Sequence, residues 1–275
     1  MSISFHKAGL SLPRVKGPEE MLSLVREVGI IPFFENSIEG FSVEEMTPSS
    51  NWFDSDQPIS NTPWDWKIYL VQSGEIAYGK FLGGKAAFAT VEWYAHLRAW
   101  RLSQEKYLPD VQQQAVIDFM AGKGSVGIKD IRGLLGIKKG RADALMQRLQ
   151  MGCRAITGDI VRVFRGPDLH YNGWQTSSFC SPEAFFDFTL PPFAQSDTAS
   201  FPPGFSGLPG LDATSPYTLS NPVYPSLGPT PPIPFDAASP LETGCTPGES
   251  YERLFEHIRS LNPSAPERLV ARLLG

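Results

Sequence analysis

The residues of this chain best suited to chemistry are basic and gather between residues 122 and 166. That segment holds ten Lys or Arg against three Asp or Glu, a local charge of +7 in a chain whose net charge is −5. Guanidinium and ammonium groups bind phosphate, and guanidinium and carboxamide groups read base edges. The charge therefore favours a nucleic acid as the partner, and the partner we expect is double-stranded DNA. The candidate DNA-binding residues are Lys138, Lys139, Arg141, Gln147, Arg148, Arg162 and Arg165.

The spacing of apolar residues predicts the elements that would position this basic set. Apolar residues recur at helical intervals over 128–135 and 142–149, and Gly136 and Gly152 end the two stretches. A further helix is expected before them, and strand-like residues after them, from Ile160 to Phe179, predict a two-stranded wing. These are the parts of a winged helix-turn-helix, a module that most often binds nucleic acid.

The predicted winged helix divides the basic set into three groups. Arg141, Gln147 and Arg148 fall on or beside the side of the second helix that is opposite its apolar stripe. Lys138 and Lys139 fall at the turn, where the free backbone N–H groups of a helix N-terminus also favour phosphate. The two remaining arginines are expected on one face of the wing. An alternative stays open, because many winged helices bind only proteins and a charged face is usually just a solvated one.

Residues 18–108 predict an α+β part that is rich in tryptophan. A helix is expected to begin at Pro18, which suits a first turn, and to end at Gly29. The pair Gly83-Gly84 between two alternating segments predicts a β-hairpin. Five of the six Trp lie in or beside this part. They form either an aromatic core or the lining of a pocket that stacks a base.

The C-terminal third of the chain has a different composition. Residues 191–248 hold 14 of the 25 prolines, four acids and no Lys or Arg, which predicts an extended or disordered linker. Helical spacing resumes at Glu249 and predicts a helical pair that docks on the body of the chain or on a protein partner. The predicted fold class is therefore α+β. Its parts are an N-terminal α+β part (18–108), a winged helix (109–190), a Pro-rich linker (191–248) and C-terminal helices (249–275).

Several classes of protein are disfavoured by the same reading. No apolar run is long enough to cross a membrane, and the first residues lack the pattern of a secretory signal. Cys153, Cys180 and Cys245 are an odd and scattered set without metal-ligand spacing. Such cysteines fit a reducing cytoplasm. We therefore expect a cytoplasmic protein with no metal and no cofactor.

A series of short motifs also runs through the chain. They are Trp64-Asp-Trp66, Ala77-Tyr-Gly-Lys-Phe81, Lys85-Ala-Ala-Phe88, Glu92-Trp-Tyr94, Leu149-Gln-Met151, Gly173-Trp174 and Ser181-Pro-Glu183. Their order resembles the bacterial AlkZ-related proteins, which are grouped with the winged-helix DNA glycosylases of the AlkZ type. The likeness runs from about Met21 to Phe186, and more weakly over Glu249 to Leu274. The Pro-rich segment lies outside it.

The resemblance implies candidates for base excision. AlkZ-type enzymes share a Gln-x-Gln or Gln-x-Asp motif, whose carboxamide can donate and accept hydrogen bonds and so aim a water. The matching segment is Gln150-Met151-Gly152, where a glycine takes the second polar position. This departure argues against intact catalysis by the motif. Glu92 and Asp65 are the alternative catalytic carboxylates, with an ordinary surface or hairpin-edge acid as the simpler interpretation. Whether the protein is an enzyme stays open.

Three functional hypotheses follow. The first is a DNA-binding, AlkZ-related repair protein that recognises damaged or distorted DNA, with an extruded base entering an aromatic pocket if it is a glycosylase. The second is a non-enzymatic transcription regulator that reads a promoter through the second helix. The third is a protein-interaction module formed by the winged helix and the C-terminal helices.

Overall fold

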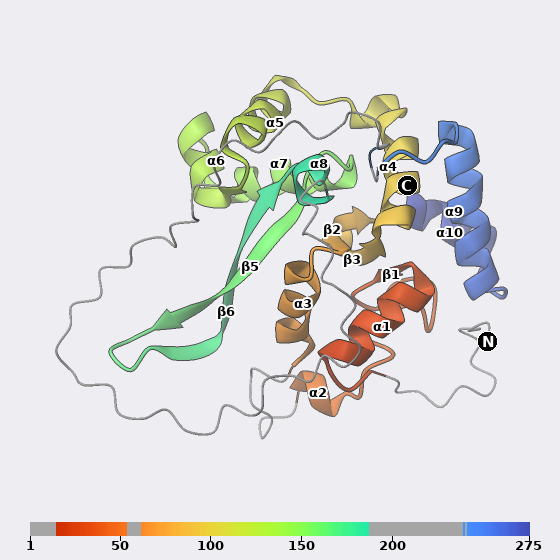
Figure 1. The fold of residues 1–275 in the computed structure, drawn as a ribbon, viewed down its shortest axis with the longest axis horizontal. Coiled ribbons are helices and arrows are strands. Elements are labelled where there is room, and N and C mark those ends of the chain that lie inside the picture. Colours follow the sequence, from red (N-terminus) through yellow and green to blue (C-terminus); the bar gives the residue numbers. More distant parts are fainter. Residues whose placement is uncertain (1–14, 54–61, 187–238, 240) are drawn as a thin grey trace, which may run out of the picture. The chain divides into compact units, whose positions relative to one another are not determined.

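The computed structural model describes residues 15–53, 62–186, 239 and 241–275. All of these residues belong to one compact unit, which joins the N-terminal two thirds of the chain to its C-terminal helices. Helices and two small antiparallel sheets are mixed in it, so the predicted α+β class is confirmed (Figure 1). The predicted linker lies outside the described residues over most of its length. None of the described helices is long and apolar enough to cross a membrane.

The N-terminal part is built on a three-stranded sheet with the order β1-β3-β2. Its elements are α1 (Pro18–Val28), β1 (Ile30–Pro32), α2 (Ser50–Phe53), α3 (Pro63–Gln72), β2 (Ile76–Leu82), β3 (Lys85–Thr90) and α4 (Val91–Leu102). The predicted first helix is confirmed from Pro18, and Gly29 ends it with a φ of 78°. A side chain at Gly29 would also meet the Trp93 ring, since an added Cβ would lie 2.1 Å from it.

The predicted hairpin is confirmed as well. Gly83 and Gly84 join β2 to β3 and have φ values of 56° and 72°. Both lie in the left-handed region, which is the conformation that a tight two-residue hairpin turn requires. The backbone of this turn lies against the second half of the chain, because the Gly84 carbonyl oxygen accepts a hydrogen bond from Gln147.

The second part follows through a short 3-10 helix, η2 (Glu105–Tyr107). Its elements are α5 (Val111–Lys123), β4 (Val126–Gly127), α6 (Ile128–Leu135), α7 (Lys139–Met151), β5 (Ile156–Arg165), β6 (His170–Cys180) and α8 (Pro182–Phe186). The three predicted helices and the two-stranded hairpin are all present. The strand β4 was not predicted because it has only two residues; it pairs with β6, giving the antiparallel order β4-β6-β5.

Local sequence explains where these helices begin and end. Asp110 accepts from the backbone N–H of Gln113 at 2.9 Å and starts α5 with a capping box. Gly136 adopts the left-handed conformation and ends α6. The apolar stripe of α7 is formed by Ala142, Leu145, Met146 and Leu149, which pack with Val116 and Met120 of α5 in a core of their own.

The C-terminal helices α9 (Pro247–Leu261) and α10 (Glu267–Leu274) pack on the body of the same chain, with α9 beside α4 (Figure 1). Leu254, Ile258 and Val270 are buried in the same core as the N-terminal sheet. Of the two docking modes that the sequence left open, the described residues therefore support packing on the chain's own body.

The end of the predicted linker belongs to the folded unit. Leu241 is buried in the main core, and Thr246 caps α9 through a reciprocal capping box with Glu249. The helix accordingly begins at Pro247, two residues before the predicted start.

The tryptophans serve mainly to pack the molecule. Trp52 and Trp66 are buried in the core, Trp93 stacks on His257 with ring centroids 3.7 Å apart, and Trp100 lies against Tyr251 of α9. The aromatic-core interpretation thus fits these rings, and no Trp lines the cavities described below.

Candidate nucleic-acid interface

A cavity of about 350 Å³ lies where the β2–β3 hairpin, α7 and the β5–β6 hairpin meet. It brings together Lys139, Gln147 and Gln150, three of the predicted site residues, with a single acidic residue, Asp143. The lining residues are Tyr78, Gly79, Lys80, Ala86, Ile128, Lys139, Asp143, Met146, Gln147, Gln150, Thr157, Ser177 and Phe179.

Gln150 is oriented by the backbone of β2. Its side-chain Oε1 accepts from the backbone N–H of Lys80 at 2.6 Å, and the residue is only 4% exposed. A backbone N–H can bond only to the amide oxygen, so this contact fixes which end of the carboxamide faces β2. The amide NH2 has no hydrogen-bond partner among the described residues. Gln150 can therefore donate to a group in the cavity, while one of the two lone pairs of its oxygen is taken by Lys80.

Gln147 lies differently from its predicted position. Its Nε2 donates to the carbonyl oxygen of Gly84 at 3.2 Å, and the side chain is half-buried. The helix α7 thus packs on two faces, one on its own core and one against the β2–β3 turn. The second face is polar, which is why the spacing of apolar residues did not reveal it.

The two arginines of α7 lie on a side of the helix that stays exposed. Arg141 is exposed and donates to the neutral side chain of Gln112 at 3.0 Å, while Arg148 is exposed without a hydrogen-bond partner among the described residues. Lys138 is the exposed N-cap of the helix. Lys139 pairs with Asp143 at 2.7 Å. Arg141 and Arg148 thus lie on the exposed side of α7 and the two lysines lie at the turn, with Lys139 directed to the cavity; DNA binding by these residues stays a prediction.

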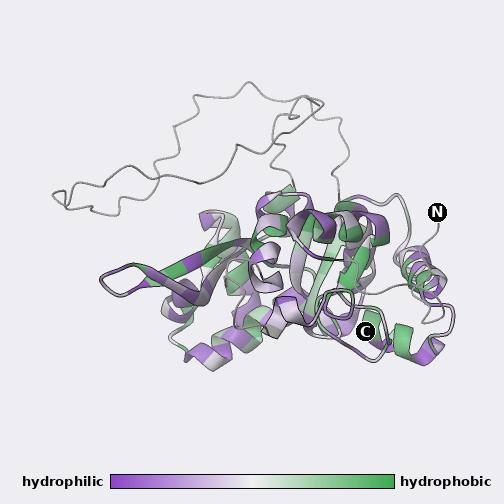
Figure 2. Cartoon of the chain, turned by 90° about the horizontal axis from the view of Figure 1, so that it is seen from below, coloured by the Kyte–Doolittle hydropathy of each residue, from purple (hydrophilic) through white to green (hydrophobic). Residues whose placement is uncertain are grey.

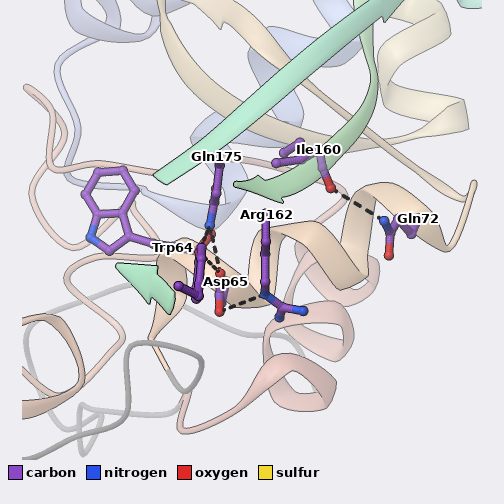
Figure 3. A network of polar contacts seen from close by, with 7 residues as sticks. Trp64, Asp65, Gln72, Ile160, Arg162 and Gln175 are labelled. Carbon is purple, nitrogen blue, oxygen red and sulfur yellow. Dashed lines mark hydrogen bonds and ion pairs between the residues drawn. The ribbon is translucent and has the colours of Figure 1, made fainter. Parts of the chain in front are cut away.

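Asp65 and Arg162, predicted for separate roles, form an ion pair at 3.2 Å (Figure 3). The Asp65 carboxylate also accepts from the Tyr171 hydroxyl at 2.6 Å and from Gln175 Nε2 at 2.8 Å, and its side chain is 1% exposed. Burial raises the pKa of Tyr171, and the hydrogen bond to Asp65 raises it further. Three donors from the β5–β6 hairpin thus converge on one carboxylate of α3, which makes Asp65 the anchor of that hairpin.

The other face of the β5–β6 hairpin is exposed and partly apolar. Arg165 lies over the Trp174 ring at 5.2 Å, and Trp174 and Leu169 are 57% and 69% exposed. Figure 2 shows hydrophobic and hydrophilic residues side by side along the hairpin, which projects from the body. The expectation that Arg162 and Arg165 share one face of the wing is wrong, because Arg162 contacts Asp65 of α3 and the strand register shifts between Arg162 and Phe164. Val161 and Trp174 alternate with the residues that bind α3.

The three predicted catalytic residues do not converge. Only Gln150 lines the cavity, since Asp65 is engaged by the hairpin and Glu92 is exposed in the first turn of α4. Tyr78, Lys80 and Asp143 line the cavity and were not predicted. Burial raises the pKa of Tyr78, so its hydroxyl stays protonated. Among the residues that the structure describes, no group of His, Cys, Asp or Glu is arranged to hold a metal.

Comparison with protein families decides the relationship. The model of the family described as "AlkZ related" matches residues 15–198, well over half of the chain. The chain belongs to the AlkZ-related family. This AlkZ-related protein matches no curated protein and no solved structure. The family relates it to DNA glycosylases and so to DNA repair.

Proposed function

We propose that this AlkZ-related protein binds double-stranded DNA through a winged helix-turn-helix, residues 109–190, and recognises damaged or distorted sites. The order of elements supports the module: α5, β4, α6 and α7 precede the β5–β6 hairpin, and the strands have the order β4-β6-β5. Three helices and a small sheet that ends in a two-stranded wing are its defining parts. The family relationship supports the link to repair.

The observation that carries the proposal is the open basic face of α7. Among the described residues, no carboxylate lies within ion-pairing distance of Lys138, Arg141 or Arg148. Unpaired cations on one exposed face are the electrostatic feature that binds a phosphate backbone. Arg165 on the wing extends this set, while Arg162 is partly committed to Asp65.

The packing of α7 against the β2–β3 turn limits how the protein can recognise DNA. Gln147 contacts the β2–β3 turn, so one side of the helix is closed to a DNA groove. This disfavours a regulator that reads many base edges along the helix. Recognition through phosphates and DNA deformability needs fewer base contacts. The cavity beside Gln150 is then the place for an extruded base, whose carbonyl oxygens or ring nitrogens can accept from the amide NH2.

The test is fluorescence-anisotropy binding to one duplex, intact or carrying an alkylated or abasic position, at several salt concentrations. Replacing Arg141 and Arg148 by Ala removes two phosphate contacts, so the slope of log K against log salt falls by about 1.8. The matched control removes two exposed arginines of α10, Arg268 and Arg272, and leaves the slope unchanged. Equal slopes in both double variants would reject the proposed interface.

The two alternatives predict other outcomes of the same experiment. Binding that ignores the lesion but depends on sequence supports a transcription regulator. An absence of binding at low salt supports a protein-interaction module. Base excision is tested by strand cleavage with alkali after incubation of the lesion duplex with the protein.

A further inference from the structure

A second cavity, of about 330 Å³, lies between η2, α5 and the C-terminal half of α7. It shares no lining residue with the cavity beside Gln150. The residues that line it are Lys106, Tyr107, Gln113, Arg148, Leu149, Met151 and Arg154. Three of these seven are cations and none is acidic, so the cavity carries concentrated positive charge.

Most N–H groups of the Arg148 and Arg154 guanidinium groups have no hydrogen-bond partner among the described residues. Arg154 donates through Nε to the Tyr107 carbonyl oxygen at 3.3 Å, and its two terminal nitrogens have no partner among the described residues. Burial lowers the pKa of Arg154, the neighbouring Arg98 lowers it further, and Glu183 opposes the shift. Arg148 is also unpaired within the described chain. Burying part of the Arg154 guanidinium costs free energy, and an anion between Arg154 and the exposed Arg148 offsets that cost.

Lys106, the third cation, and the apolar residues that line the cavity limit the ligands that can bind there. Lys106 bonds to the Gly275 carbonyl oxygen and lies over the Tyr107 ring at 5.1 Å. Tyr107 is itself held by Arg101, whose Nη1 donates to its hydroxyl at 2.8 Å. With Leu149 and Met151, this ring forms an apolar wall beside the cations. A ligand that fits must therefore join an anionic group to an apolar or flat body.

We propose that this cavity binds a nucleoside monophosphate unit. The phosphate lies between Arg148 and Arg154, and the sugar and base lie against Tyr107, Leu149 and Met151. Guanidinium pairs bind phosphate through two parallel hydrogen bonds each, and the volume is at the small end of ligand pockets. The same unit is supplied by a free nucleotide or by the 5′-phosphorylated end of a DNA strand. The second source rests on the proposed function, whereas the first does not.

The first experiment is calorimetric titration of the full chain with thymidine 5′-monophosphate and with thymidine. We expect thymidine to bind at least about tenfold more weakly, because it lacks the charge-assisted bonds. The single variants Arg154→Gln and Lys106→Gln should each weaken binding of the nucleotide by about fivefold to tenfold. Arg268→Gln, on the exposed side of α10, changes nothing. Circular dichroism establishes that each variant is folded. Equal affinity for the two compounds, or full affinity in Arg154→Gln, overturns the proposal.

The second experiment identifies the source of the phosphate. Nicked duplexes with a 5′-phosphate or a 5′-hydroxyl at the nick are compared with an intact duplex. A preference for the 5′-phosphate that Arg154→Gln abolishes assigns the cavity to strand ends. Nucleotide binding without that preference assigns it to free nucleotides. Binding of the intact duplex without any nucleotide binding rejects the cavity but keeps the proposed function. Nucleotide binding without duplex binding keeps the cavity as a binding site and rejects the proposed function.

Discussion

At the scale of single residues, the orientation of Gln150 decides what chemistry it can perform. The Gln150 oxygen accepts from the Lys80 N–H through one of its two lone pairs, so a single further acceptor site remains on that oxygen. The free NH2 can only donate. Gln150 is therefore suited to holding an acceptor atom of a ligand, and Gly152 supplies no side chain to complete the pair. Gly79 permits this arrangement, since an added Cβ would lie 3.0 Å from Gln150 Oε1.

Replacing Gln150 by Leu tests this contact. The change leaves the part-buried Lys80 N–H without its acceptor, so the free energy of unfolding falls by about 1–3 kcal/mol. Gln147→Leu is the matched control, because its bond to Gly84 is longer and lies nearer to solvent; it costs about 0.5–1.5 kcal/mol. Urea unfolding measures both. A Gln150→Leu protein as stable as the parent protein would show that β2 does not hold the amide.

At the scale of elements, the β5–β6 hairpin is fastened to α3 through one carboxylate. Asp65→Ala removes the acceptor of three donors, and we expect a loss of about 1–3 kcal/mol in the free energy of unfolding. The amides of the distal hairpin should also exchange faster with solvent. Asp159→Ala is the control, because it removes only an exposed bond to Gln72 and a local bond to the neighbouring Ile160 N–H from the same hairpin. Unchanged exchange rates in Asp65→Ala would mean that the strand ladder alone positions the wing.

The contact between α4 and α9 is predicted to depend on pH. Burial lowers the pKa of His257, whereas its bond to the Val28 carbonyl oxygen and the charge of Glu92 act to raise it. Burial, together with Arg253, lowers the pKa of His96, and Glu92 opposes this shift. Both folded pKa values lie below the usual 6.5, so the unfolded chain binds more protons as the pH falls. The stability that the neutral histidines contribute is full above pH 6.5 and is lost as the pH falls from 6.5 through the lower folded pKa values.

Urea unfolding at pH 7.5 and 5.5 measures this effect. The parent protein should be less stable at pH 5.5, and the double variant His96→Gln, His257→Gln should lose most of the difference. Protection of α9 amides from exchange should fall together with stability. A double variant that keeps the full pH dependence would place its origin in the carboxylates.

The elements also separate what sequence can predict from what it cannot. The limits of α1, the β2–β3 hairpin and α7 follow from Pro18, Gly29, Gly83 and Gly152, because backbone conformation is local. The position of Gln147 depends on Gly84, which lies 63 residues away. No spacing within α7 contains that information. The same is true of Asp65, whose three partners come from a strand pair about one hundred residues later.

At the scale of the whole molecule, Arg101 connects three regions that are distant in sequence. It is 1% exposed and no carboxylate among the described residues pairs with it. Its guanidinium donates to the carbonyl oxygens of Phe81 at 3.1 Å, Met151 at 2.5 Å and Leu274. Met151 and Leu274 end α7 and α10, where the partial negative charge of the helix dipole favours a cation. Two helix ends thus serve as the counter-charge, and the end of β2 is held to both.

Arg101→Met should therefore destabilise the molecule as a unit. Removing the cation relieves its own desolvation, but it leaves three carbonyls and the Tyr107 hydroxyl without their donor. Charged donors contribute about 1.5–3 kcal/mol each, so the lost bonds outweigh the relief and the free energy of unfolding falls by about 3 kcal/mol or more. Arg272→Met, on the exposed side of α10, is the control and stays within about 0.5 kcal/mol of the parent. Urea unfolding followed by far-ultraviolet circular dichroism and by tryptophan fluorescence should give coincident transitions at a lower midpoint. If only the C-terminal helices melted early while the remainder kept its midpoint, Arg101 would secure α10 alone and would not connect the three regions.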